Sequence, residues 1–196
     1  MDFRSLRALS LSMLLLSGCA TAVAPSGTED RFFANLSSMC GRAFAGRVVT
    51  TDPADRDLAG QRLVMHVRAC SHGEIRIPFH VGADRSRTWV ISRTASGLRL
   101  KHDHRHEDGS ADVRTQYGGD SIPPGTARRQ SFPADAHSRA LFVRENIPAS
   151  VGNIWSVEIV PGHVFAYGLA RPGRSLRVEF DLTQPVAPPP PPWGAR

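Results

Sequence analysis

Hydrophobic and polar residues alternate along much of the chain, and the clearest case is the segment GLRLKHDHRHEDG at residues 97–109. Successive side chains of a β-strand point to opposite faces, so a period of two predicts a strand here. One face would carry Leu98, Leu100, His102, His104 and His106, and the other Arg99, Lys101, Asp103, Arg105 and Glu107. The first face is apolar and then lined with imidazoles, whereas the second is charged and is expected to face water. Asp108-Gly109 then favours a tight hairpin turn.

The same pattern predicts a mainly β protein with a single domain over residues 28–184. Besides the segment above, strands are expected at residues 46–51, 61–70, 74–81, 88–93, 112–117, 140–145, 153–160, 163–170 and 175–182. Short strands at regular spacing indicate an antiparallel sandwich or barrel. Hairpin follows hairpin and closure removes exposed strand edges, so we favour an up-and-down β-barrel of about 8–10 strands. The longest break is a loop at residues 118–129.

Only one helix is predicted, and it precedes the strands. Ser26-Gly27-Thr28-Glu29 fits a capping box, in which serine and glutamate each bond the other's free amide. Phe32, Leu36, Met39 and Cys40 then recur at helical spacing. We expect an amphipathic helix over residues 28–39, ended by Gly41, that covers one end of the core.

A short helix before an antiparallel meander resembles the calycin group, the lipocalins and their relatives. The resemblance is one of architecture, because the first strand has Gly46-Arg47-Val48 in place of the lipocalin Gly-x-Trp signature. It implies a barrel whose interior holds a small apolar ligand. The KHDHRHEDG run and the Tyr117-Gly118-Gly119 after it are also similar to segments of secreted proteobacterial proteins, a similarity that implies no function.

The N-terminus has the features of a targeting segment. Arg4 and Arg7 precede a short apolar run at residues 9–16, which is typical of a signal peptide and too short to span a bilayer. The next residues, LSGC, resemble the lipobox of bacterial lipoproteins, which implies that residues 1–18 are removed and Cys19 is lipidated. Residues 19–27 would then be a flexible tether. Ala20 favours the outer membrane, on its periplasmic side. The alternative is an ordinary secretory signal that is cleaved near Ala20 to Ala24, so that Cys19 is lost.

Two further cysteines remain in the mature chain. Cys40 and Cys70 would lie in an oxidising compartment, where two thiols indicate a disulfide. Two buried free thiols are the alternative, because the sequence does not give the distance between them.

The histidine row is the strongest candidate for chemistry, and three interpretations stay open. His102, His104 and His106, with Leu100 beside them, would form the polar part of a ligand-binding cavity. Alternatively, the row is the end of a strand emerging into solvent before the turn. In the third interpretation His102 and His104 share a metal ion, but the sequence names no further ligand. We predict a ligand contact, with no metal and no cofactor.

No motif of a catalytic nucleophile, zinc protease or phosphate-binding loop is present, so no catalytic residue is predicted. The formal net charge of +6 favours anionic surfaces such as phospholipid head groups. Aromatic residues are not interleaved with the arginines in the way that base stacking requires, which argues against nucleic acid.

Three functions are therefore compatible with the sequence. The first is a non-catalytic lipoprotein that binds a small apolar or amphipathic ligand in its barrel. The second is an assembly lipoprotein that contacts another envelope protein through its basic surface and its tail. That tail, VAPPPPPWGAR, is expected to be disordered over residues 185–196, since consecutive prolines exclude it from a sheet. The third is a metal-binding protein or metal-dependent enzyme that uses the histidine row.

Overall fold

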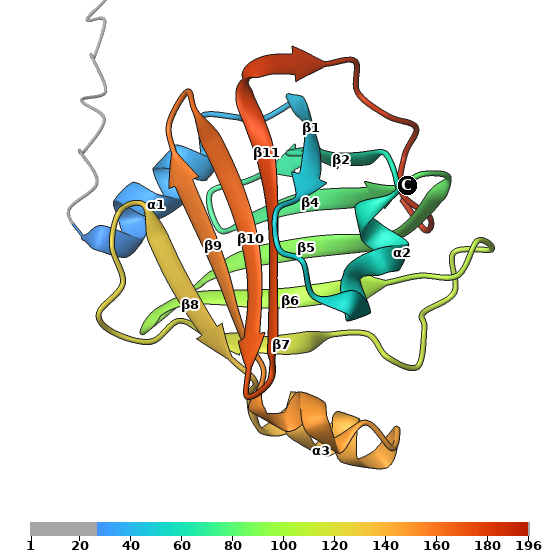
Figure 1. Ribbon diagram of the computed structural model, residues 1–196. Helices are drawn as coiled ribbons and strands as arrows, with labels where there is room; N and C mark the ends of the chain where they lie inside the picture. The colour runs from blue at the N-terminus through green and yellow to red at the C-terminus, as the bar shows by residue number, and fades with distance from the viewer. Residues whose placement is uncertain (1–26, 196) are drawn as a thin grey trace, which may run out of the picture.

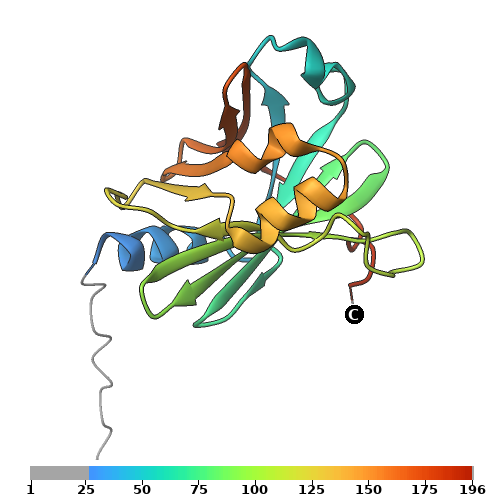
Figure 2. The same cartoon turned by 90° about the horizontal axis from the view of Figure 1, so that it is seen from below.

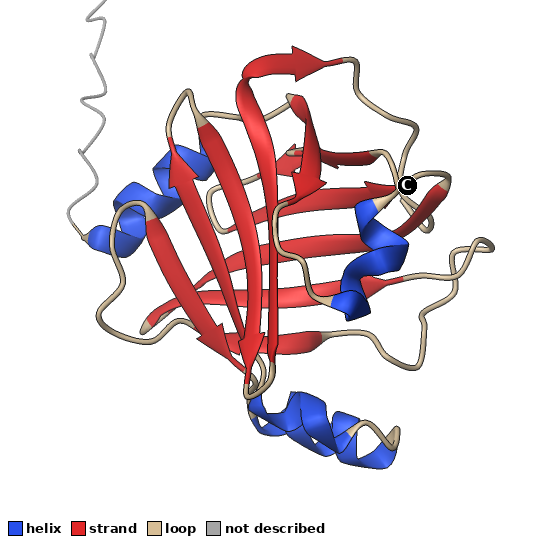
Figure 3. Cartoon of the chain, viewed as in Figure 1, coloured by secondary structure: helices blue, strands red, loops and turns tan. Residues whose placement is uncertain are grey.

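The computed structural model describes residues 27–195, which form an antiparallel and nearly closed β-barrel (Figure 1). Going around the barrel, the order is β7-β6-β5-β4-β2-β1-β11-β10-β9-β8. Figure 3 shows that the helices lie outside the wall of strands. The strands are β1 (Ala43–Val48), β2 (Leu63–His66), β4 (Glu74–Val81), β5 (Asp84–Thr94), β6 (Gly97–His104), β7 (Tyr117–Asp120), β8 (Arg129–Pro133), β9 (Ile154–Val160), β10 (Val164–Arg171) and β11 (Arg174–Val186), with the short β3 (Ala69–Cys70) beside β4.

The order confirms the predicted meander. Strands β4 to β7 and strands β8 to β11 are each joined by successive antiparallel pairings, and β1 connects the two series by pairing with both β2 and β11. Buried side chains alternate along the strands, as in β9, where Trp155, Val157 and Ile159 point inward. These inward faces form one hydrophobic core.

Two glycines bring the edges of β7 and β8 together. The amide of Gly118 donates to Ser138 Oγ at 2.7 Å, and its carbonyl accepts from the amide of Asp135 at 2.9 Å. A Cβ on Gly119 would lie 1.8 Å from the carbonyl oxygen of Pro133, so only glycine permits this approach. The glycines that the sequence assigned to a loop are therefore part of the seam that nearly closes the barrel.

Helix α1 (Thr28–Ser37) confirms the predicted N-terminal helix and lies across one end of the barrel. It buries Phe32, Phe33 and Leu36 in the core, and Asn35 Nδ2 donates to the carbonyl of Ala127 between β7 and β8. Its N-cap is Gly27, which makes no side-chain cap bond. Ser26, the serine of the predicted capping box, lies outside the described residues, as do residues 1–18 and Cys19.

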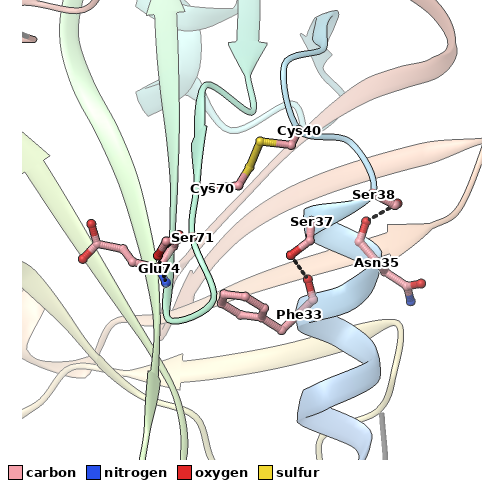
Figure 4. Close-up of a disulfide and its surroundings, with 8 residues drawn as sticks. All are labelled: Phe33, Asn35, Ser37, Ser38, Cys40, Cys70, Ser71 and Glu74. Carbon is pink, nitrogen blue, oxygen red and sulfur yellow. Dashed lines mark hydrogen bonds between the residues drawn. A yellow bond between two sulfur atoms is a disulfide. The ribbon is translucent and has the colours of Figure 1, made fainter. Parts of the chain in front are cut away.

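The predicted disulfide is confirmed. Cys40 follows α1 and Cys70 belongs to β3, and their Cα atoms are 6.2 Å apart across the bond (Figure 4). The bond connects the covering helix to the wall of the barrel at the β3–β4 corner.

The strand predicted at residues 140–145 is wrong, because this segment is the second half of helix α3 (Ala136–Arg144). Asp135 caps the helix by accepting from the amide of Ser138 at 2.8 Å. Ser138, Leu141 and Phe142 are buried at spacings of three and four, which is the period of a helix and not of a strand. The other helical turns that the sequence did not predict are η1 (Pro53–Asp55), α2 (Arg56–Ala59) and η2 (Pro148–Gly152).

The predicted strand at residues 112–117 is also wrong. The chain makes one isolated bridge after β6, between Arg105 and Ala111, and then forms a loop as far as β7. Asp112 accepts from the amide of Arg114 at 2.6 Å, so the side chain stabilises a local turn that competes with strand pairing.

Two surface predictions also differ from the structure. Asp103 is only 8% exposed, although the sequence assigned it to a face in water. The tail, which was expected to be disordered from residue 185, instead continues β11 to Val186 and then packs on the outside of the sheet through Trp193.

Candidate ligand-binding site

A cavity of about 450 Å³ lies in the barrel, between the strand ends that are farthest from α1 and helices α2 and α3. Figure 2, which views the molecule from below, shows α3 in front of the barrel and beside this region. The volume is in the range of sites that hold small organic molecules. The lining side chains are Leu58, Phe79, Arg87, Trp89, His102, His104, Asp112, Arg114, Tyr117, Phe142, Ile147, Ser150, Asn153, Trp155, Tyr167, Leu169 and Leu176.

Aromatic rings form the inner part of the cavity. Trp89 of β5 stacks on Tyr167 of β10, with ring centroids 4.4 Å apart, and on Phe79 of β4 at 4.8 Å. His102 of β6 stacks on Tyr117 of β7 at 4.4 Å. The Trp89–Tyr167 stack joins two strands that are far apart in the sequence, and each stack stabilises the orientation of its members.

His102 is held by hydrogen bonds at both ring nitrogens. Nδ1 lies 3.1 Å from the carbonyl oxygen of Tyr117, which can only accept, so Nδ1 carries the proton. Nε2 therefore accepts from the hydroxyl of Tyr167 at 2.8 Å. Burial, and to a smaller extent repulsion from His104 when that ring is protonated, lowers the pKa of His102 to about 3, so the ring is neutral at neutral pH.

His104 lies nearer the mouth. Its Nε2 is 3.1 Å from the hydroxyl oxygen of Tyr117. Burial, followed by the positive charge of Arg87, lowers the pKa of His104, and burial raises the pKa of Tyr117 to about 12. Both groups are therefore uncharged at neutral pH and act as hydrogen-bonding groups, not as charges.

The predicted ligand residues separate into two groups. His102 and His104 line the cavity, whereas Leu100 is completely buried in the core and His106 is exposed. His106 does not reach the cavity because β6 ends at His104 and the chain turns at residues 106–110. The sequence did not identify Trp89, Trp155 or Tyr167, although each stands in a predicted strand segment.

Charged groups lie at the mouth of the cavity. Arg87 forms an ion pair with Asp84, whereas Arg114 forms no ion pair with another described residue. Asp112 carries the opposite charge, and its carboxylate is engaged by the backbone amide of Arg114. Asn153, 6% exposed, accepts from Arg171 through Oδ1 at 3.0 Å.

Within residues 27–195, no three His, Cys, Asp or Glu side chains gather closely enough to hold a metal ion. The described part of the chain also contains no helix long and apolar enough to cross a membrane.

Comparison with known proteins adds no identity. We found no protein-family model, no curated protein and no solved structure that matches the chain. The function must therefore be inferred from the cavity itself.

Proposed function

We propose that this protein binds a small amphipathic molecule in its barrel, without catalysis. The observation that supports this best is the cavity of about 450 Å³, whose inner part is aromatic and whose mouth carries arginines. An apolar body would contact the rings of Trp89, Trp155 and Tyr167, and burial of apolar surface would supply most of the binding free energy. The up-and-down order of the strands, which resembles that of the calycin group, supports the same function.

The hydrogen bonds inside the cavity favour an apolar group there. His102 uses both ring nitrogens within the protein, and Tyr167 donates its only hydroxyl proton to His102. A polar ligand group placed beside them would lose water and gain few partners, which is unfavourable. The apolar end of the ligand is therefore directed inward.

The mouth favours an acidic group at the other end of the ligand. Arg114 has an exposed guanidinium, and Arg87 lies on the same cavity. Guanidinium groups form short, charge-assisted hydrogen bonds with carboxylates, sulfonates and phosphates. Asp112 opposes an anion, but its carboxylate already accepts the amide of Arg114.

We also propose that the protein is a lipid-anchored component of the cell envelope, on the periplasmic side of the outer membrane. The support is the lipobox-like LSGC at residues 16–19, with Cys19 as the lipidated residue. The Cys40–Cys70 disulfide agrees with an oxidising compartment. Contact with a second envelope protein through the basic surface stays a prediction from the sequence, as does the absence of a nucleic-acid partner.

Two fluorescent probes of similar shape test the binding function. 8-Anilino-1-naphthalenesulfonate carries a sulfonate, and N-phenyl-1-naphthylamine is its neutral counterpart. We expect both to bind the folded chain, and Leu169→Trp, which fills the cavity, to abolish binding of both. Ile154→Trp adds the same side chain at a residue that is 42% exposed and outside the cavity, so it should bind like the wild type. If neither probe binds to the folded wild type, the proposal is refuted.

The same probes test the acidic end. The sulfonate should bind about tenfold more tightly than the neutral probe, the effect of one charge-assisted hydrogen bond. Arg114→Gln should remove that difference, whereas Arg128→Gln, at an exposed arginine near the end covered by α1, should keep it. Equal binding of the two probes to the wild type would refute the proposal that the ligand has an acidic group. It would not contradict binding of an apolar molecule in the cavity.

A further inference from the structure

The proline-rich tail makes specific contacts with the outer face of the sheet. The amide of Trp193 donates to the carbonyl of Arg85 at 3.1 Å, and Arg85 Nη1 donates to the carbonyl of Pro191 at 3.1 Å. Gly194 lies against Gly109 and the side-chain carbons of Arg105. In Figure 2 the C-terminus lies beside the β4–β5 hairpin and the loop after β6, so the tail connects two corners of the same wall.

Trp193 is the anchor of this contact. It lies between two surface cavities of about 350 Å³ each and contributes to the lining of both. Val64, His80 and Ala83 line the first cavity, whereas Pro78, Thr88 and Asp103 line the second. The outer face of β2, β4, β5 and β6 is therefore shaped around one indole ring and the prolines before it, and we call it the tail-binding face.

The tail has the properties of a peptide ligand. Pro188 to Pro192 favour the polyproline II conformation before any contact is made, which reduces the entropy lost on docking. The backbone carbonyl of Pro191 and the amide of Trp193 supply the hydrogen bonds, and the indole supplies the apolar contact. Proline-rich segments that are already in the polyproline II conformation are a known class of peptide ligand.

Two polar atoms at the docked tail have no hydrogen-bond partner among the described residues. Trp193 Nε1 is buried without a hydrogen-bond partner, and so is Nε2 of His80, which lines the same cavity. Leaving a buried polar atom without a partner opposes docking, because both atoms could bond to water if the tail were displaced. A tail released from this face would leave it open to the same segment of another molecule.

We propose that the tail-binding face recognises proline-rich segments with a tryptophan anchor, and that a second copy of this chain supplies one when the two tails are exchanged. The tail of a second copy would fit this face, since it could repeat every contact that the tail makes with the tail-binding face within one chain. Exchange of identical segments between copies creates a dimer without any new contact surface. Within one chain the tail has the advantage of a high local concentration, so exchange requires concentrated protein.

A labelled peptide with the sequence of residues 186–196 tests the recognition. It should bind the full chain carrying Trp193→Ala, whose own anchor is missing, and bind the wild type at least about tenfold more weakly, because the tail of the same chain competes. The peptide in which tryptophan is replaced by alanine should not bind. Adding Arg85→Gln to the Trp193→Ala chain should weaken binding, whereas adding Arg128→Gln should leave it unchanged. Circular dichroism of each variant establishes that it is folded.

Sedimentation of the wild type tests the partner and needs no substitution. The chain should form dimers as its concentration rises, and an excess of the peptide should return them to monomers. A folded Trp193→Ala chain that binds neither peptide, or binds both equally, would overturn the recognition. Peptide binding by a wild type that stays monomeric at every concentration would overturn the second copy as the partner.

Discussion

The Nε2 atom of His102 lies 2.8 Å from the hydroxyl oxygen of Tyr167, and this bond joins β6 to β10, two strands that are not neighbours in the sheet. The imidazole is 3% exposed and the phenol 7%. Because the Nδ1 proton is given to Tyr117, the Tyr167 hydroxyl must be the donor. The pair fixes the inner part of the cavity before any ligand is bound.

Tyr167→Phe should therefore lower the free energy of unfolding. The substitution leaves His102 Nε2 buried without a donor, which costs about 1–3 kcal/mol in urea unfolding. Tyr117→Phe is the matched control, since its hydroxyl bonds the less buried His104 at 3.1 Å. Its loss should be smaller, and equal losses would contradict the importance that we give to the His102–Tyr167 bond.

The protein should become less stable as the pH falls from about 6.5 to 4.5. The pKa of His102 is lowered to about 3 in the folded chain, whereas the unfolded value is near 6.5. In this window the unfolded state binds the proton more readily, so the free energy of unfolding falls by up to about 1.4 kcal/mol per pH unit. This contribution is complete above the unfolded value and decreases below it.

Thermal or urea unfolding at several pH values measures this dependence. Burial also lowers the pKa values of His66, His80 and His104, which act in the same direction, so the comparison with His102→Gln isolates one residue. The variant should show a smaller change between pH 6.5 and 4.5. Parallel curves for the wild type and the variant would show that His102 does not titrate as inferred.

Arg174→Met should strongly destabilise the segment that carries α2. Arg174 forms ion pairs with Asp52 at 3.0 Å and with Asp55, which is 1% exposed. Without the arginine, the buried carboxylate of Asp55 has lost its cation, a change that costs about 3–5 kcal/mol. Leu58 of α2 lines the cavity, so probe binding should weaken as well.

Arg177→Met provides the comparison for this variant. Arg177 pairs with Glu158 at 3.1 Å and Glu179 at 2.7 Å, all with partly exposed side chains, and such pairs contribute about 0–1 kcal/mol. Adding Asp55→Asn to Arg174→Met should recover part of the lost stability. No recovery would mean that the loss arises from packing of the arginine and not from its charge.

Gly119→Ala should open the seam between β7 and β8. Its methyl group would overlap the carbonyl of Pro133, and the backbone shift should cost about 1–3 kcal/mol in unfolding free energy. A Cβ at Gly73 would meet nothing within 4 Å, so Gly73→Ala should have little effect. Faster hydrogen exchange of the amides in β7 and β8 would locate the opening, and unchanged exchange would refute the role of Gly119.

The sequence determined most of the strand wall because alternation is a local property, but it did not predict β8 and assigned most of β7 to a loop. The segments in β4, β5, β6, β9, β10 and β11 could be recognised from their own residues, as could helix α1. The two cysteines that follow the expected signal peptide favoured a Cys40–Cys70 disulfide, and the structure contains it. Residues 140–145 misled the interpretation, because a short run such as ALFVRE has no clear period until Asp135 and Ser138 define a helix start.

Only the tertiary structure decided which residues share the cavity. Trp89, Trp155 and Tyr167 come from three strands, and they line one cavity because the barrel curves those strands toward one another. His106 shows the opposite case, since its alternation is correct but the strand ends before it. The same holds for the tail, whose prolines determine its conformation, while the indentation that receives Trp193 depends on how four strands are placed side by side. Periodicity fixes the face on which a side chain lies, whereas its partners depend on contacts between distant segments of the chain.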